Sequence, residues 1–194
     1  AMLDPRMTTL AEGLVGHSAQ LQSGEHVLIE AFDVPEAMVI ALIRATRAVG
    51  AHPHVAIRNA RISRALIVEG ADEQYELMAA SDLHRMQHMD AYIGLRGGLN
   101  ASESAGIPSD RQQAWGRLYG QPVHMQERVK RTRWCVLRWP TPSMAQLAGK
   151  STEAFEDFYF DVCTLDYGAM ADAAEALRKR MAGTDAVHLK GPGD

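Results

Sequence analysis

Cysteine and long apolar runs are scarce in this sequence of 194 residues. Its two cysteines, Cys135 and Cys163, belong to no recognisable motif, which excludes a small secreted domain built on disulfides and is typical of a reducing compartment. The longest apolar run covers residues 37–43, whereas a membrane-spanning helix needs about 20 apolar residues. Residues 1–22 lack an apolar core behind a basic head, so we expect no signal peptide and a cytoplasmic protein with no membrane partner.

The sequence also lacks a strong excess of charge of one sign. Its 20 basic and 24 acidic residues leave a net charge of −4, which gives no overall attraction to nucleic acid or to an anionic membrane. One basic run, Arg128, Lys130, Arg131 and Arg133, could contact nucleic acid, but it leads directly into a predicted strand. We therefore interpret this run as a solvated helix end and expect no nucleic-acid partner.

The composition itself is ordinary for a globular protein, with 46% hydrophobic and 23% charged residues. A chain of this length buries roughly 70% of the surface that its unfolded form exposes, so its core needs no disulfide or metal. Four short stretches rich in β-forming residues alternate with longer stretches of helical period. The predicted strands cover residues 25–31, 52–58, 90–96 and 133–139.

The first two predicted strands are joined by a single helix, residues 34–49. A strand, a helix and a strand in that order form a β-α-β unit, which pairs the strands in parallel through a right-handed crossover. The sequence therefore predicts an α/β fold in three layers. Helices cover both faces of a mostly parallel sheet of four or more strands, as in Rossmann-like and flavodoxin-like proteins.

Polar side chains are expected to begin several of the helices. Asp33 with Glu36, and Ser109 with Gln112, have the spacing of a capping box, in which the first side chain accepts a hydrogen bond from the first helical turn. Ser81 is expected to cap the second part of another helical stretch. These three positions therefore predict where helices start.

The last third of the sequence is expected to be helical up to a final strand. Thr141, followed by Pro142, and Ser151 are predicted to begin two short helices, and residues 169–181 to form a longer one. Residues 185–190 have the pattern of a further strand.

Two histidine pairs have the spacing of metal ligands. His84 and His88 lie four residues apart on a predicted helix, so both rings face one way, and Asp82 or Asp90 could add an oxygen ligand. The glutamate of an H-E-x-x-H motif is missing between them, because residues 85–87 are Arg, Met and Gln. We favour a solvated helix face over a metal site here.

The second pair, His52 and His54, lies on a predicted strand and so shares one face of it. Pro53 between them favours an edge position over a ligand cradle. The interpretation that needs no metal is again the one we favour.

A glycine-containing loop, residues 94–100, follows the third predicted strand, where doubly wound folds place their phosphate loops. It matches neither G-x-G-x-x-G nor G-x-x-x-x-G-K-[ST]. We interpret it as a turn that needs positive φ, and the alternative is a stand-alone module that binds a small anion or nucleotide through residues 97–102.

Nucleophiles and acidic groups do not complete an active site either. Cys135 is expected to be buried and inert in a strand, and Cys163 lies in an aromatic-rich helix. Glu153, Asp157 and Asp161 fall four residues apart and could bind a cation, but they are typical of a solvated helix face. No complete active site can be assembled from these residues.

A family resemblance rests on several stretches in a fixed order. They are Gly24–Ile29, Val49–Val55, Asp90–Asn100, and the most specific set, Trp139–Gln146, Ala148–Ser151 and Glu153–Phe158. In this order they resemble the M29 family of thermophilic, aminopeptidase T-like metalloaminopeptidases, some of which are described as leucyl aminopeptidases. The resemblance covers nearly the whole sequence.

The resemblance implies that residues 1–183 are the N-terminal α/β domain of a longer enzyme and that residues 184–194 begin a C-terminal catalytic domain. It also implies two divalent metal ions, Zn, Co or Mn, bound by Glu, His, Tyr and Asp of that second domain, a peptide substrate and a homodimer. No position here matches those metal-binding motifs, so we expect no catalytic, cofactor-binding or metal-binding residue and no cofactor in this segment.

The leading hypothesis is therefore the non-catalytic N-terminal part of a metal-dependent aminopeptidase that removes N-terminal residues from peptides. Its expected role is in substrate access and dimer contacts, and we expect the segment alone to be inactive. The alternatives are the small-anion or nucleotide module described above and a protein-interaction domain.

Overall fold

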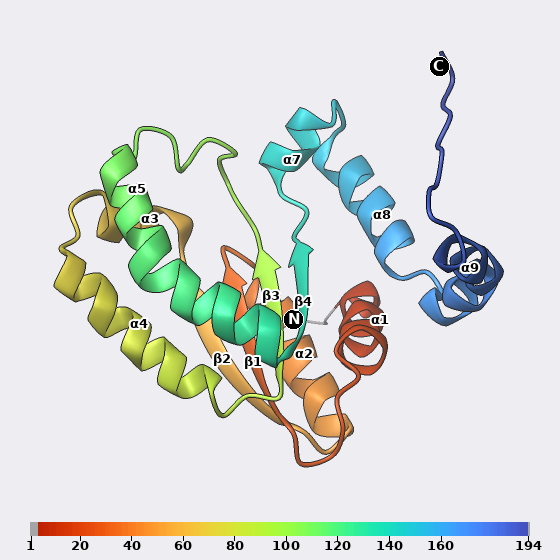
Figure 1. Cartoon of the computed structure of the whole chain (residues 1–194), viewed down its shortest axis with the longest axis horizontal. Helices are drawn as coiled ribbons and strands as arrows, with labels where there is room; N and C mark the ends of the chain where they lie inside the picture. The colour runs from red at the N-terminus through yellow and green to blue at the C-terminus, as the bar shows by residue number, and fades with distance from the viewer. Residues whose placement is uncertain (1–3, 194) are drawn as a thin grey trace. The chain divides into compact units, whose positions relative to one another are not determined.

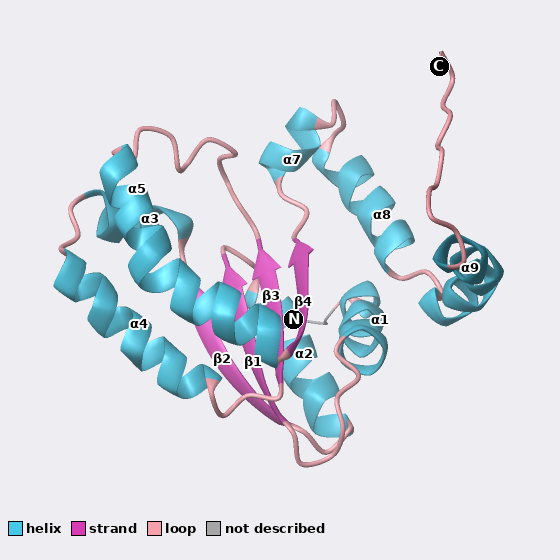
Figure 2. Cartoon of the chain, viewed as in Figure 1, coloured by secondary structure: helices cyan, strands magenta, loops and turns pink. Residues whose placement is uncertain are grey.

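A parallel sheet of four strands lies at the centre of the chain (Figures 1 and 2). A computed structural model describes residues 4–193, which divide into two compact units at residues 164 and 165. The strands, in the spatial order β2-β1-β3-β4, are β1 (His26–Phe32), β2 (His52–Arg58), β3 (Ala91–Arg96) and β4 (Arg133–Arg138). All three strand pairs are parallel, which confirms the predicted α/β fold.

Helices account for most of the remaining first unit. They are α1 (Pro5–Gly13), α2 (Glu36–Ala48), α3 (Ala60–Val68), α4 (Asp72–Met86), α5 (Ser109–Trp115), α6 (Val129–Arg131), α7 (Pro142–Leu147) and α8 (Thr152–Cys163). Two segments are π-helical, η1 (Leu14–Ser18) and η2 (Gly116–Arg128). Pro122 lies inside η2, and a regular α-helix is disfavoured there because proline lacks an N–H and its ring clashes with the carbonyl four residues earlier.

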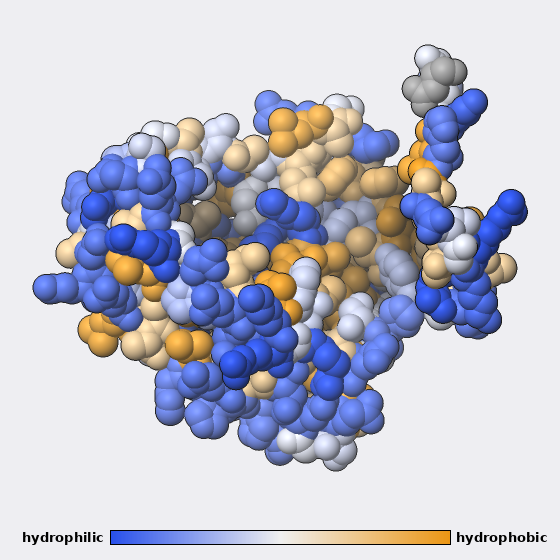
Figure 3. Space-filling model, in the orientation of Figure 1, coloured by the Kyte–Doolittle hydropathy of each residue, from blue (hydrophilic) through white to orange (hydrophobic). Residues whose placement is uncertain are grey.

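Each face of the sheet packs against its own helices, because side chains alternate along a strand. In β1, Val27, Ile29 and Ala31 belong to a core that includes buried residues of α1, α2 and α8. Leu28 points the other way, into a core with residues of α4 and η2. Hydrophilic side chains predominate over α4 on the face that Figure 3 shows, as expected for a helix with one buried side. The three-layer arrangement is therefore confirmed.

Asp33 does not cap α2, so that prediction is wrong. Its carboxylate accepts hydrogen bonds from Asn59 Nδ2 at 2.6 Å and from the backbone N–H of Ala60 at 2.9 Å. The reason is tertiary: the ends of β1 and β2 are paired, which brings Asp33 beside the start of α3. α2 begins after Pro35 without a side-chain cap.

Two other predicted caps are wrong and two are confirmed. Ser81 lies within α4, and Ser109 is the first residue of α5 after Pro108, so neither side chain occupies the capping position. Thr141 accepts a hydrogen bond from Met144 N and Ser151 accepts one from Ala154 N, as predicted for α7 and α8. Ser81 shows that a helix can continue through a residue that favours a capping position.

The second unit, residues 165–194, contains α9 (Tyr167–Ala182). Asp166 begins this helix by accepting a hydrogen bond from Ala169 N at 2.9 Å, and Gly183 follows its end. The strand predicted over residues 185–190 is wrong, because these residues are exposed and pair with no strand among residues 4–193. A strand exists only through hydrogen bonds to a neighbouring strand, which a sequence pattern does not guarantee. Of the helices within residues 4–193, none combines the length and the apolar character needed to cross a lipid bilayer.

Gly97 directly follows β3 and lies against the end of β1. Its N–H donates to the carbonyl oxygen of Phe32 at 2.8 Å, and a Cβ atom added at Gly97 would lie 2.4 Å from the carbonyl oxygen of Asp33. Neither Gly97 nor Gly98 has positive φ, so our interpretation of the loop as a positive-φ turn is wrong. What Gly97 provides is room for two backbone segments to approach closely.

Gly97→Ala should therefore destabilise the protein, whereas Gly98→Ala should not. The new methyl group at Gly97 meets backbone atoms that cannot rotate away, and we expect the free energy of unfolding to fall by about 1–3 kcal/mol. Nothing lies within 4 Å of a Cβ at Gly98, which makes it a matched control. Urea denaturation of both variants measures the difference, and equal stability of the two would contradict the close-approach argument.

Candidate functional site

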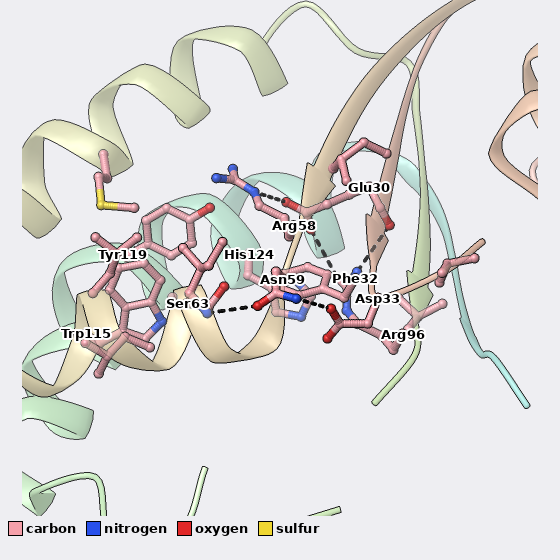
Figure 4. A pocket seen from close by; sticks show the side chains of 18 of the residues that line it. Glu30, Phe32, Asp33, Arg58, Asn59, Ser63, Arg96, Trp115, Tyr119 and His124 are labelled. Atoms are coloured by element: carbon pink, nitrogen blue, oxygen red, sulfur yellow. Dashed lines mark hydrogen bonds and ion pairs between the residues drawn. The ribbon is translucent and has the colours of Figure 1, made fainter. Parts of the chain in front are cut away.

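A cavity of about 910 Å³ opens at the carboxyl ends of the strands (Figure 4). Its walls come from the ends of the four strands and the loop after β1, from α3, α4 and α5, and from η2. Parallel strands end at the same edge of a sheet, and this edge is where open α/β sheets place their ligands. The order in which the strands are added to the sheet changes direction at β1, because β2 lies on one side of it and β3 on the other.

Three of the four strands end in an arginine at this edge. Arg58 ends β2, Arg96 ends β3 and Arg138 ends β4. Phe32 at the end of β1 is in register with both Arg58 and Arg96, and Arg96 is in register with Arg138. The strand register therefore gathers three guanidinium groups along one side of the cavity, which all three residues line.

Glu30 lies beneath these arginines and is only 2% exposed. Its carboxylate pairs with Arg96 Nη2 at 3.1 Å, Arg58 Nε at 3.4 Å, and both terminal nitrogens of Arg128 at 3.3 Å. The Tyr92 hydroxyl donates to the same carboxylate at 2.7 Å and also contacts Arg96. We call these five residues the Glu30 cluster; Figure 4 shows Arg58 and Arg96 on either side of Glu30.

Glu30 stays ionised in spite of its burial. Burial raises the pKa of this carboxyl, but the charge of Arg128, the hydrogen bond from Tyr92 and the charges of Arg96 and Arg58 together hold the pKa below its ordinary value. Burial, followed by the negative charge of Glu30, raises the pKa of Tyr92 to about 12, so its hydroxyl remains a donor at neutral pH. The cluster is thus one carboxylate facing three guanidinium groups.

A second buried carboxylate, Asp82, adjoins the Glu30 cluster from α4. It accepts from Arg58 Nη2 at 2.7 Å, from Arg85 Nη2 at 2.8 Å and from the Tyr119 hydroxyl at 2.5 Å. Burial, and then the hydrogen bond to Asp82, raises the pKa of Tyr119. With Asp82 included, four guanidinium groups surround two carboxylates, so positive charge is in excess at the cavity.

The other end of the cavity is apolar and aromatic. Trp115 and Tyr119 stack with their ring centroids 4.2 Å apart and their planes 14° apart. Figure 4 shows this pair well away from Glu30 and Arg96, across the cavity. Ile62 and Leu66 of α3 add aliphatic surface. The cavity therefore has a cationic side formed by the arginines and a mainly apolar side, on which the Tyr119 hydroxyl reaches Asp82.

The first histidine pair with the spacing of metal ligands lies exposed at the C-terminal end of α4. His84 and His88 are both exposed with their ring centroids 5.0 Å apart, and His88 Nδ1 lies 2.8 Å from the carbonyl oxygen of His84. Asp82 is held by arginines, and Asp90 accepts a hydrogen bond from the backbone N–H of His26 at 2.8 Å. Both rings are exposed, as expected for a solvated helix face.

The second pair is joined by a histidine that sequence reasoning missed. His26 is in register with His52, and its Nδ1 lies 2.9 Å from His54 Nε2. Burial, and then the charge of His26, lowers the pKa of His54, which favours its neutral form. Among residues 4–193 no three His, Cys, Asp or Glu side chains come together in an arrangement that could hold a metal ion. The described residues therefore do not fit the two-metal centre that the family resemblance implies.

The basic run is split by the structure. Lys130 and Arg131 are exposed, as expected for a solvated helix end, but Arg128 is 3% exposed and belongs to the Glu30 cluster. Arg133 pairs with Glu25. The interpretation of Arg128 as solvated is therefore wrong, because the residue lies on the side of η2 that faces the sheet.

The remaining candidates are not part of the cavity. Cys135 and Cys163 are free and half-buried, and burial raises the pKa of both thiols, which disfavours the reactive thiolate. Glu153, Asp157 and Asp161 are exposed on α8, and Asp157 accepts from Arg6 at 2.7 Å. The loop of residues 97–102 contributes no residue to the cavity lining.

Two sequence signals could have identified the cavity. Glu30 is the one charged residue within the apolar run of β1, and an ionised side chain in a buried strand requires a partner. The second signal is the repeated ending of a branched apolar residue and arginine, as in Ile57-Arg58, Leu95-Arg96 and Leu137-Arg138. Reading these three endings as one edge needs the parallel register, which the sequence alone predicts only in outline.

Glu30→Gln should test how much of the fold depends on the buried charge. The amide keeps the shape of the side chain but leaves three guanidinium groups without their counter-charge, so we expect the free energy of unfolding to fall by about 3–5 kcal/mol near neutral pH. Because the folded pKa is lowered, the charge of Glu30 stabilises the protein above its ordinary pKa of 4.5, and this contribution is lost as the pH falls through the folded pKa.

Urea denaturation over a range of pH values measures both effects, with Glu12→Gln on the exposed side of α1 as the control. The gap between wild type and Glu30→Gln should narrow in acid, while the control stays within about 0.5 kcal/mol of wild type. A similar small change in both variants would show that the buried charge is dispensable.

Comparison with known proteins places this fold in a family. A family model described as thermophilic metalloprotease (M29) matches residues 3–187. The solved structure of wild-type AmpT from Thermus thermophilus is 17% identical, with a TM-score of 0.63, and the match covers 84% of this chain and 43% of that one. At this identity the likeness shows the fold, and the chain spans less than half the length of AmpT.

Other matches are weaker. An alcohol dehydrogenase superfamily protein from Novosphingobium aromaticivorans is 16% identical with a TM-score of 0.32, over 97% of this chain and 60% of that one, which is too low to support an argument. A comparison with curated protein sequences finds no significant match. Because the family model spans nearly all of the sequence, this chain belongs to the M29 family of thermophilic metalloproteases.

Proposed function

We propose that this chain acts as the N-terminal, non-catalytic part of a metal-dependent aminopeptidase that removes N-terminal residues from peptides. The observation that carries the proposal is the match of the M29 family model to residues 3–187. The likeness to AmpT adds to it, since the matched fold corresponds to 43% of the AmpT chain. Residues 1–183 would then be the N-terminal domain and residues 184–194 the beginning of the catalytic domain.

The divalent ions of such an enzyme would be bound outside the residues described here. The carboxylates in or beside the cavity are already engaged: Glu30 and Asp82 pair with arginines, and Asp33 accepts hydrogen bonds from Asn59 Nδ2 and the N–H of Ala60. A carboxylate held by guanidinium groups is a poor ligand, because a cation would have to displace or repel them. The role that fits these residues is to shape the approach of a peptide to the catalytic part.

The sharpest test is hydrolysis of leucine p-nitroanilide with added Co²⁺ or Zn²⁺. We expect the 194-residue chain to release no nitroaniline above a metal-only blank. We also expect the gene to continue past codon 194 into a region rich in Glu, His, Tyr and Asp, and the longer product to hydrolyse the substrate. A stop codon directly after codon 194, or metal-dependent turnover by the 194-residue chain, would contradict the proposal.

We further propose that the chain forms homodimers in solution. The edge strand β4 supports this part, since Trp134 and Val136 are 48% and 40% exposed on a strand that, within residues 4–193, pairs with a neighbour on one side only. Large apolar side chains on an open edge are a common basis for association.

Sedimentation velocity tests the dimer and its surface together. We expect twice the mass of the chain for wild type and the mass of one chain for Trp134→Glu, because a buried carboxylate would oppose association. Leu77→Glu, at an exposed apolar position on α4, is the matched control and should remain dimeric. A monomeric wild type, or a dimer in all three proteins, would remove this surface from the proposal.

A further inference from the structure

We infer that the cavity at the carboxyl edge of the sheet binds a carboxylate carried on an apolar body. The chemistry is that of the C-terminal residue of a peptide or of a simple aryl or alkyl carboxylic acid. The inference requires no catalysis and does not depend on the proposed function. It rests on four features of the cavity. These are its excess positive charge, its unused hydrogen-bond donors, the nearby backbone N–H groups that are already hydrogen-bonded, and its apolar side.

Positive charge at the cavity exceeds what the protein itself neutralises. Four arginines line it: Arg58, Arg96, Arg128 and Arg138. Of the two lining carboxylates, Glu30 pairs with the first three, and Asp82 beside the cavity also pairs with Arg58. The other lining carboxylate, Asp33, is engaged by Asn59 and Ala60. The side chain of Arg138 forms no ion pair or hydrogen bond with any residue from 4 to 193, and the residue is exposed at the end of β4. A partly enclosed surface with this excess attracts an anion.

The donors within the Glu30 cluster are also not exhausted. Arg128 Nε is buried and has no hydrogen-bond partner among the described residues. Arg58 and Arg96 have side chains that are 28% and 24% exposed, so both can offer N–H groups to a ligand as well as to Glu30. The planar fork of a guanidinium group matches the two oxygens of a carboxylate.

The backbone around the cavity favours a carboxylate over a phosphate. Doubly wound folds bind phosphate through free backbone N–H groups at a helix N-terminus. Here the N–H of Ala60 donates to Asp33, the N–H of Ile62 donates to Asn59, and Pro35 has no N–H. The Asp33 carboxylate at this position would also repel a dianion. Recognition therefore falls to the arginine side chains.

The apolar side of the cavity would contact the apolar part of the ligand. Ile57 and Ile62 are 67% and 63% exposed although they line the cavity, and the stacked pair Trp115 and Tyr119 forms a flat wall. The volume of about 910 Å³ is within the usual range of small-molecule sites, roughly 300–1,000 Å³. Figure 4 shows the aromatic pair across the view from Glu30 and Arg96, with Arg58 between them, so a ligand with one charged and one apolar end can meet both kinds of surface.

Titration of the 194-residue chain with N-acetyl-L-phenylalanine and with its neutral amide tests the charge requirement. Isothermal calorimetry gives the affinity, and a change in tryptophan fluorescence reports on the apolar side, since Trp115 is the one of the three tryptophans that lines the cavity. We expect the acid to bind about tenfold more tightly than the amide or better, because hydrogen bonds to a charged group are the strong ones. Equal affinity for acid and amide, or no binding of the acid at millimolar concentration, would overturn the assignment.

Further probes separate the sources of the carboxylate from other anions. If octanoate binds as tightly as N-acetyl-L-phenylalanine, the site is one for simple carboxylic acids. If octanoate binds more weakly, the site is one for peptide C-termini. Both results support a carboxylate site. Adenosine monophosphate or inorganic phosphate that binds more tightly than either acid would overturn the choice of carboxylate.

Arg138→Gln and Arg47→Gln form a matched pair of variants. Arg138 lines the cavity and holds no internal ion pair, so its loss should leave the fold intact and weaken binding of the acid about tenfold, with binding of the amide unchanged. Arg47 is exposed on α2 outside the cavity, and its substitution should leave both affinities unchanged. Wild-type affinity for the acid in Arg138→Gln, with circular dichroism showing a folded protein, would overturn the inference.

Discussion

The arrangement of strands and helices at the carboxyl edge of the sheet depends on a single buried carboxylate, that of Glu30. Glu30 lies on the face of the central strand β1, where an ionised side chain is tolerated only if cations and donors surround it. Its partners Arg58, Arg96 and Arg128 come from β2, β3 and η2. The need to neutralise one charge therefore ties both neighbouring strands and the covering helix to β1 at one edge of the sheet.

The same requirement gives the cavity its character. Three arginines are more than one carboxylate needs, and the excess positive charge faces an opening whose far wall is the stacked pair Trp115 and Tyr119. An apolar residue at position 30 would remove the counter-charge that holds Arg58, Arg96 and Arg128 at this edge. Stability and recognition are linked here because the arginines that keep Glu30 ionised are also the groups that a ligand would meet.

Much of the architecture could be predicted from local patterns. The four strands lie within a residue or two of their expected positions because each is a short apolar run bounded by turn residues, and the single helix between β1 and β2 required a parallel pair. The family resemblance also rested on short stretches of sequence, and the match of the family model to residues 3–187 confirms it. The caps were predicted less well: Asp33 has the right chemistry for a cap but serves α3, because strand pairing decides which helix start lies beside it.

The sequence by itself determined the strands, the crossover helix, the family and the absence of a familiar active-site motif, since each of these depends on neighbours along the chain. Only the tertiary structure decided that Arg128 is buried, that three strand endings form one cationic edge, and that Gly97 lies against the carbonyl oxygen of Asp33. The physical reason is that charge pairing and close packing depend on distances in space. Residues 30 and 128 are remote in sequence, and the packing of η2 against the sheet brings them together.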